Sequence, residues 1–137
     1  MKKIWINGMM GVVVGDALGM PVQFVDRAEL KNNPVETMQG YGTYNMPPGT
    51  WSDDSSMALA TLDSIRAIGE VDYSDIMERF YHWLFFGKYT PAGKAFDQGS
   101  TCVEAICNYV YYLQKVMHSP KMSELTDGRD YLVSAVF

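Results

Sequence analysis

The sequence predicts an all-α protein, and three observations lead to this prediction. Four segments carry apolar side chains at the three- and four-residue spacing of a helix that is buried on one side. Each segment ends at a glycine or shortly before a proline, as helices commonly do. Apart from the ambiguous last seven residues, YLVSAVF, no segment shows the alternation of a strand flanked by hairpin turns.

The first predicted helix covers residues 3–19 and is expected to stop at Pro21. Its glycines recur every three or four residues, and such a stripe of small residues lets another backbone approach closely. The stripe consists of Gly8, Gly11, Gly15 and Gly19, and Asp16 lies beside it in an apolar setting.

After this helix, residues 22–50 contain turn formers without a sustained period, which predicts a long irregular connection of the kind that is often functional. Three further helices are predicted over residues 55–68, 74–86 and 100–118. Their buried sides are expected to carry Met57, Ala60, Leu62, Ile65 and Ile68, then Ile76, Met77, Phe80, Trp83 and Leu84, then Val103, Ile106, Val110 and Leu113. A turn and an apolar stretch are expected after Pro120.

Size and composition indicate one globular domain that handles a small substrate. A chain of 137 residues with 47% apolar and 20% charged residues can bury one core and is not a disordered tail. The formal net charge is −5, and Lys and Arg are nowhere clustered. A nucleic-acid partner is therefore not expected, because binding phosphates requires a basic surface.

The cysteines and the opening residues favour a cytoplasmic protein. Cys102 and Cys107 are five residues apart on one predicted helix, where they are poorly aligned for a disulfide, so we expect two buried, reduced thiols. Two lysines precede an apolar run at the start, but Asn7 and Asp16 interrupt the run and no clean cleavage site follows, so no signal peptide is expected. The run is also too short and too interrupted to span a membrane.

The stretch GTWSDDSSM, residues 49–57, places two adjacent acids before a predicted helix. A carboxylate there can accept hydrogen bonds from free backbone N–H groups, so capping explains one acid. Two adjacent negative charges repel each other, and a divalent cation would remove that cost. Ser52, Asp53 and Asp54 offer the hard oxygen atoms that magnesium or manganese prefers. Capping and metal binding both remain open from this stretch alone.

Other polar residues have alternative interpretations too. Asp16 could hydrogen-bond to a neighbouring loop, or it could orient a metal-bound water or a ligand from behind the metal ligands. His82 and His118 have no third ligand at a useful spacing, so packing or solvent-facing roles are expected. Aromatic rows on helices usually fill cores, and this is expected of Tyr109, Tyr111 and Tyr112 in preference to an adenine platform.

Three ordered motifs carry a family resemblance. They are GVVVGDALGMPVQF, then GTWSDDSSMAL about thirty residues later, then AFDQGST. In this order and spacing they resemble the amino-terminal part of the ADP-ribosylglycohydrolase family, over roughly residues 5–105. The resemblance implies an all-α fold that holds two magnesium or manganese ions. It also implies hydrolysis of the bond between ADP-ribose and an acceptor, so the expected partner is an ADP-ribosylated protein or a small ADP-ribose conjugate.

The resemblance further implies a role for each site residue. A hydroxyl-Asp-Asp triplet that supplies metal ligands falls on Ser52, Asp53 and Asp54, with Ser where Thr is common. The acid of an Asp-x-Gly-x-Thr stretch falls on Asp97 and would lie near the substrate, although it could equally cap the helix that begins near residue 100. Asp16, Asp54 and Asp97 are the predicted catalytic residues: the ions would activate a water, Asp16 would support them, and Asp97 would orient substrate or water.

Two departures from the family pattern shape the prediction. Gln23 stands where many relatives have glutamate, and an amide cannot take a proton as a carboxylate does. Relatives are about twice as long and have a late G-D-x-D-T motif, which Asp127 and Asp130 in TDGRD do not reproduce. The family pattern fades after about Ile106, which leaves a divergent tail over residues 107–137.

We therefore predict one partial domain over residues 1–137, a fragment that is truncated or internally deleted relative to the family. Three protein oxygen atoms would bind the divalent ions weakly, so little or no hydrolysis is expected from the isolated chain. The alternative is a non-catalytic helical relative that binds ADP-ribose or a protein partner. An uncovered apolar face would in that case favour self-association.

Overall fold

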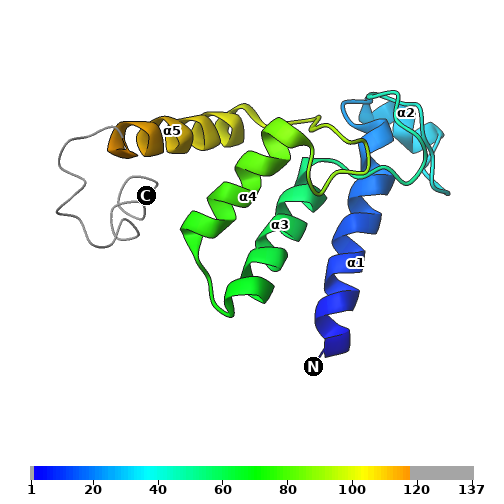
Figure 1. The fold of residues 1–137 in the computed structure, drawn as a ribbon. Helices are drawn as coiled ribbons and strands as arrows, with labels where there is room; N and C mark the ends of the chain where they lie inside the picture. The colour runs from blue at the N-terminus through cyan, green and yellow to red at the C-terminus, as the bar shows by residue number, and fades with distance from the viewer. Residues whose placement is uncertain (1, 118–137) are drawn as a thin grey trace.

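A computed structural model describes residues 2–117, and within this range the chain is helical with no strand, which confirms the all-α prediction. The helices α1, α3 and α4 lie next to one another, and α5 runs across one end of α4 (Figure 1). The elements are α1 (Lys2–Gly19), the 3-10 turn η1 (Met20–Val22), α2 (Arg27–Asn32), α3 (Asp53–Ile68), α4 (Tyr73–Phe86) and α5 (Ser100–Met117). His118, Asp127, Asp130 and the apolar stretch predicted after Pro120 lie outside the described residues.

The predicted ends of α1, α3 and α4 are confirmed, and one short helix was missed. Gly69 and Gly87 follow α3 and α4 with φ angles of 91° and 65°, the left-handed conformation that glycine adopts most easily. The missed helix, α2, lies inside the predicted irregular connection. Asp26 caps it by accepting a hydrogen bond from the backbone N–H of Ala28 at 2.7 Å. Six residues are too few to reveal a helical period in the sequence.

The core is built around α3, which packs against both α1 and α4. The prediction that Leu62 and Ile68 face the core is wrong, because their side chains are 39% and 46% exposed. The buried positions of α3 are instead small ones, and they recur every four residues at Ser56, Ala60 and Ser64. Small side chains let α4 approach closely with its larger buried residues, Ile76 and Trp83.

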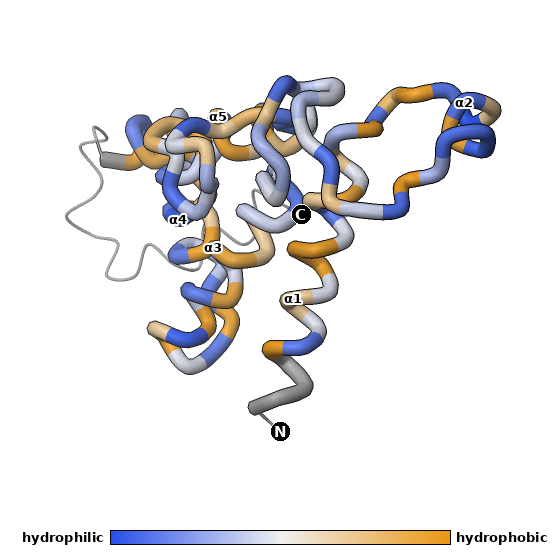
Figure 2. Tube along the Cα trace, turned by 90° about the vertical axis from the view of Figure 1, so that its right-hand side faces the viewer, coloured by the Kyte–Doolittle hydropathy of each residue, from blue (hydrophilic) through white to orange (hydrophobic). Residues whose placement is uncertain are grey.

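In the described part of the chain, the glycine stripe of α1 is not covered by another backbone, although the sequence predicted that one could approach it closely. A Cβ atom added at Gly8, Gly11, Gly15 or Gly19 would meet nothing within 4 Å, so within residues 2–117 no backbone packs closely against this stripe. Much of α1 remains uncovered, and its apolar segments are visible in Figure 2. Ile6, Met10 and Val14, spaced four residues apart, are 61%, 54% and 42% exposed. No helix of the described residues is long and apolar enough to cross a membrane.

Helix α5 packs on α4 mainly through Ile106 and Tyr109, which are buried. Tyr111 is exposed and lies under the ammonium group of Lys115, so the packing role predicted for the three tyrosines holds for Tyr109 and not for Tyr111. Both cysteines are free thiols, but Cys107 is exposed and Cys102 only partly buried, so the prediction of two buried thiols is wrong. On α4, His82 packs beside Phe86, in agreement with its predicted packing role.

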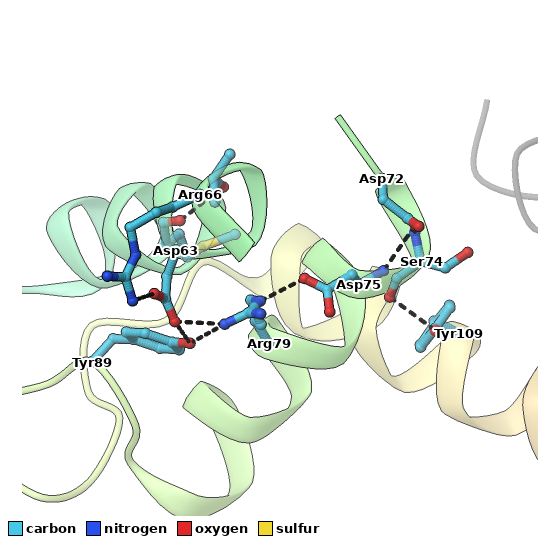
Figure 3. Close-up of polar contacts among 10 residues, drawn as sticks. Asp63, Arg66, Asp72, Ser74, Asp75, Arg79, Tyr89 and Tyr109 are labelled. Carbon is cyan, nitrogen blue, oxygen red and sulfur yellow. Dashed lines mark hydrogen bonds and ion pairs between the residues drawn. The ribbon is translucent and has the colours of Figure 1, made fainter. Parts of the chain in front are cut away.

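A polar network ties α3 and α4 to the loop that precedes α5 (Figure 3). Arg79 of α4 donates to Asp75 at 2.6 Å and to Asp63 of α3 at 2.5 Å, and the hydroxyl of Tyr89 donates to the same Asp63 oxygen at 3.0 Å. The hydrogen bond from Tyr89 and the nearby arginines hold the pKa of Asp63 below its usual value. The backbone oxygen of Tyr89 accepts a hydrogen bond from the Trp51 indole at 2.9 Å. The network therefore connects Trp51, which precedes the acid pair, to α3 and to the loop that leads to Asp97.

Candidate active site

A cavity of about 1020 Å³ lies between α1, the start of α3 and the segment before α5. The predicted site residues, which are far apart in the sequence, all border it: Asp16 from α1, Ser52, Asp53 and Asp54 from the start of α3, and Asp97 from the loop before α5. The lining contains these four carboxylates and no lysine, arginine or histidine. The cavity is therefore strongly electronegative and suited to cationic or hydrogen-bond-donating groups.

Asp16 organises the start of α3 from the neighbouring helix. One of its oxygen atoms accepts from the backbone N–H and the hydroxyl of Ser52, at 3.1 and 2.7 Å. The other accepts from the backbone N–H groups of Ser52 and Ser55, at 2.9 and 3.1 Å, and from the Ser55 hydroxyl at 2.6 Å. The side chain of Ser52, the N-cap residue, makes no capping hydrogen bond of its own. Asp16 thus provides the capping hydrogen bonds, whereas the sequence had left open that one of the two adjacent acids provides them.

Asp53 and Asp54 form the first turn of α3 and are not its cap. Asp53 is half-buried, whereas Asp54 is exposed. Burial raises the pKa of Asp53, and the negative charges of Asp54 and Asp97 raise it further, against smaller lowering effects of hydrogen bonds from Gly99 and Ser52. Asp53 therefore carries an electrostatic cost in the folded chain.

Asp97 is held by two side chains from the loops after α1. Both the amide nitrogen of Gln23, at 3.3 Å, and the hydroxyl of Tyr44, at short range, donate to its Oδ1 atom. Burial, the hydrogen bond to Asp97 and the charges of Asp97 and Asp53 raise the pKa of Tyr44 to about 12. Asp97 is not the cap of α5, because the first turn closes at the Gly99 oxygen, which accepts from Val103 N–H at 3.0 Å.

Tyr44 was missed by the sequence analysis because it lies in the irregular connection and belongs to none of the three motifs. Its position depends on the loop around it. Thr43 donates through its backbone N–H to the Pro21 oxygen at 2.9 Å and through its hydroxyl to the Gln23 oxygen at 2.6 Å. A Cβ atom on Gly42 would overlap the Pro21 carbonyl, so glycine is required for this approach. No sequence signal distinguished Tyr44 from Tyr41, which lies in the same loop.

Phe24 is a second residue that the sequence analysis did not single out. It borders the same cavity, its side chain is 83% exposed, and its backbone has a φ of 65°, which is uncommon for a bulky residue. The only signal in the sequence was its place at the end of the motif PVQF.

The side-chain oxygen atoms at the start of α3 are of the kind that a hard divalent cation prefers, and they would fill only part of its coordination shell. The Ser52 hydroxyl donates a hydrogen bond to Asp16, which leaves the lone pairs of its oxygen available. Asp53 and Asp54 each add a carboxylate. Within residues 2–117, no group of three or more His, Cys, Asp or Glu side chains is arranged to hold a metal ion. The site therefore offers two carboxylates and a hydroxyl, with water free to complete the coordination.

Comparison with known proteins identifies sequences that this chain resembles. A family model described as ADP-ribosylglycohydrolase matches residues 5–132. The chain is 33% identical over 104 residues to ADP-ribosylarginine hydrolase Tri1 of Serratia proteamaculans, a match that covers 76% of this chain and 28% of the relative. It is 35% identical over 108 residues to ADP-ribosyl-[dinitrogen reductase] glycohydrolase of Rhodospirillum rubrum, covering 77% of this chain and 34% of the relative. The chain thus spans about a quarter to a third of the length of the curated relatives it matches.

Proposed function

The chain belongs to the ADP-ribosylglycohydrolase family, and we propose that it acts in the metal-dependent hydrolysis of ADP-ribosyl bonds. The observation that carries the proposal is the convergence of Asp16, Asp53, Asp54 and Asp97 on one cavity without a basic residue. Glycosidic cleavage passes through a positively charged, oxocarbenium-like state of the ribose. A cavity lined by carboxylates stabilises that charge as it develops.

We assign Ser52, Asp53 and Asp54 as ligands of Mg²⁺ or Mn²⁺. Burial raises the pKa of Asp53 most, and repulsion from Asp54 and Asp97 raises it further. The raised pKa supports this assignment, because a cation would relieve that repulsion. Asp16 would support the ligand set by keeping the Ser52 hydroxyl and the first turn of α3 in place. When bound, the cation would supply Lewis acidity toward the ribose hydroxyls and a water molecule.

The remaining acids have distinct roles in the proposal. Asp97 is fixed by two donors, so it suits the orientation of the ribose or of the attacking water. Asp54 is exposed at the cavity, where a carboxylate can contact both a cation and a substrate hydroxyl.

We propose an ADP-ribosylated arginine of a protein as the substrate. Two of the matched relatives, from Serratia proteamaculans and Pseudomonas putida, are named for ADP-ribosylarginine. The charge of the cavity supports the same acceptor, because a guanidinium group is cationic and the lining holds four acids and no base. A cytoplasmic location fits the two free thiols.

The test is a manganese titration of the purified chain in the presence and absence of ADP-ribose. Calorimetry and the shift of the thermal unfolding midpoint measure the binding. We expect weak, saturable manganese binding that ADP-ribose strengthens, and loss of this binding in Asp53→Asn/Asp54→Asn. Glu36→Gln is the matched control, because Glu36 is exposed and lies away from the cavity lining. Manganese binding that the double substitution leaves unchanged would contradict the metal assignment. Rapid release of ADP-ribose from a modified protein would contradict only the expectation that the isolated chain has little or no hydrolytic activity.

A second candidate function is a non-catalytic binding module that self-associates. The exposed apolar residues Ile6, Met10 and Val14 on α1 favour it, because contiguous apolar surface of this kind promotes association. Sedimentation combined with the manganese titration separates the two candidates. A module of this kind would associate and leave manganese unbound, whereas the proposed hydrolase site binds the ion.

A further inference from the structure

Two hydrogen bonds to Asp97 end on the same oxygen atom. The Gln23 amide and the Tyr44 hydroxyl both donate to Oδ1. The two donors come from different segments of the chain, since Gln23 and Tyr44 lie 74 and 53 residues before Asp97 in the sequence. Among the described residues, Oδ2 is thus the oxygen left to face a ligand in the cavity that Asp97 lines.

In both hydrogen bonds Gln23 or Tyr44 is the donor and Asp97 is the acceptor. A glutamine amide has no titratable proton, so its N–H₂ group always presents a donor to the carboxylate. Tyr44 stays protonated because its pKa is raised to about 12. Both groups therefore present hydrogen-bond donors to the same Asp97 oxygen.

The surrounding loops restrict the motion of this arrangement. The Tyr44 ring packs against Phe96, with 5.7 Å between ring centroids, next to Asp97 in the chain. Thr43 bonds to the backbone oxygen of Gln23, so the two donors are also connected to each other. Asp97 itself has a φ of 57°, a conformation that its neighbours must hold in place.

We propose that Gln23 and Tyr44 are positioning residues that orient Asp97 to accept a hydrogen bond from a hydroxyl of the substrate's terminal ribose. This inference rests on the proposed function, since it assumes that ADP-ribose enters the cavity. A carboxylate repels the diphosphate and pairs with hydrogen-bond donors, and the terminal ribose is the part of the substrate richest in hydroxyl donors. In the proposed function this ribose lies beside Asp53 and Asp54, which border the same cavity as Asp97.

The experiment compares the affinities of ADP-ribose and ADP, which lacks the terminal ribose, by calorimetry. We expect Tyr44→Phe, which keeps the ring against Phe96, and Gln23→Glu, which places a second carboxylate beside Oδ1, to weaken ADP-ribose binding about tenfold. ADP affinity should change less than about twofold, because ADP lacks the group that Asp97 would bind. Tyr41→Phe is the control, since Tyr41 is an exposed tyrosine of the same loop.

The outcomes separate this inference from the proposed function. If the native chain binds ADP-ribose no better than ADP, both fail. If it prefers ADP-ribose and neither Tyr44→Phe nor Gln23→Glu alters that preference, only the role of Gln23 and Tyr44 fails. If the substitutions weaken the binding of ADP-ribose and of ADP equally, they disturb the fold and not the ribose contact. This result would also overturn the inference. The thermal midpoints of all variants are measured alongside.

Discussion

At the scale of single residues, the four acids of the cavity differ because their surroundings differ. Asp16 is surrounded by N–H and O–H donors from Ser52 and Ser55, which satisfy its charge and make it part of the framework. Asp53 is half-buried between other acids, and its raised pKa records an unfavourable interaction in the folded chain. A residue that costs stability where it stands is typical of a binding site and not of a core.

We expect Asp53→Asn to stabilise the fold at pH 7. The folded-state pKa of Asp53 is raised from its ordinary value of 3.8, so the ionised group destabilises the fold, and this cost develops as pH rises through the raised pKa. Below the unfolded pKa the group is protonated in both states and the cost is absent. The free energy of unfolding should therefore rise by less than about 1 kcal/mol at pH 7, because solvent screens the repulsion.

Chemical denaturation of the native chain and Asp53→Asn at pH 7 and at pH 3 checks this prediction. The gain should disappear at pH 3. Glu36→Gln, an exposed acid away from the cavity lining, should give no gain at either pH. A loss of stability at pH 7 would show that the helix dipole outweighs the repulsion among the acids.

At the scale of elements, the loops place the site residues as firmly as the helices do. The loop before α5 is attached to α3 and α4 through Tyr89, and the segment before α3 is attached to that loop through Trp51. The loop that carries Tyr44 is attached to the turn after α1 through Thr43. Glycine at position 42 makes this last contact sterically accessible.

A pair of glycine-to-alanine substitutions tests whether the loop contact matters. Gly42→Ala should destabilise the fold by about 1–3 kcal/mol, because the added methyl group overlaps the Pro21 carbonyl. Gly11→Ala on α1 should stabilise it by about 0.5–1 kcal/mol, because alanine is the better helix former and the methyl group meets nothing within 4 Å. Urea denaturation of both variants measures the two effects. Similar changes in both would contradict the close approach at Gly42.

At the scale of the whole molecule, the described helices leave apolar surface uncovered. α1 contacts α3 on one side, while Ile6, Met10 and Val14 on α1 are exposed. Residues four apart on a helix lie on nearly the same side, so the three form a continuous stripe. Such a stripe on a chain of this size promotes association with a second apolar surface.

We expect the purified chain to self-associate with increasing concentration, and we expect Met10→Lys to reduce this. A charge in the middle of the stripe must be desolvated when the surface is covered, which opposes association. Sedimentation velocity over a range of concentrations measures the effect. Ile68→Lys is the control, because Ile68 is similarly exposed but lies at the end of α3. Equal effects of both substitutions would indicate nonspecific aggregation and not association through α1.

The sequence alone predicted the four long helices and singled out acids that border the cavity. Helical spacing, Gly69 and Gly87 were enough for the last residues of α3 and α4, and three ordered motifs were enough to single out Ser52, Asp53, Asp54 and Asp97. These features are local, since a helix depends on hydrogen bonds and side-chain spacing within a few residues.

Only the tertiary structure decided which groups meet. That Asp16 caps α3, that Tyr44 and Gln23 hold Asp97, and that Leu62 is exposed while Ser56 and Ser64 are buried all depend on how distant segments pack. A periodic pattern gives a helix its faces but not the neighbour of each face, and an irregular loop has no period at all. Hydrogen bonds between residues tens of positions apart form only after the helices have placed their partners within reach.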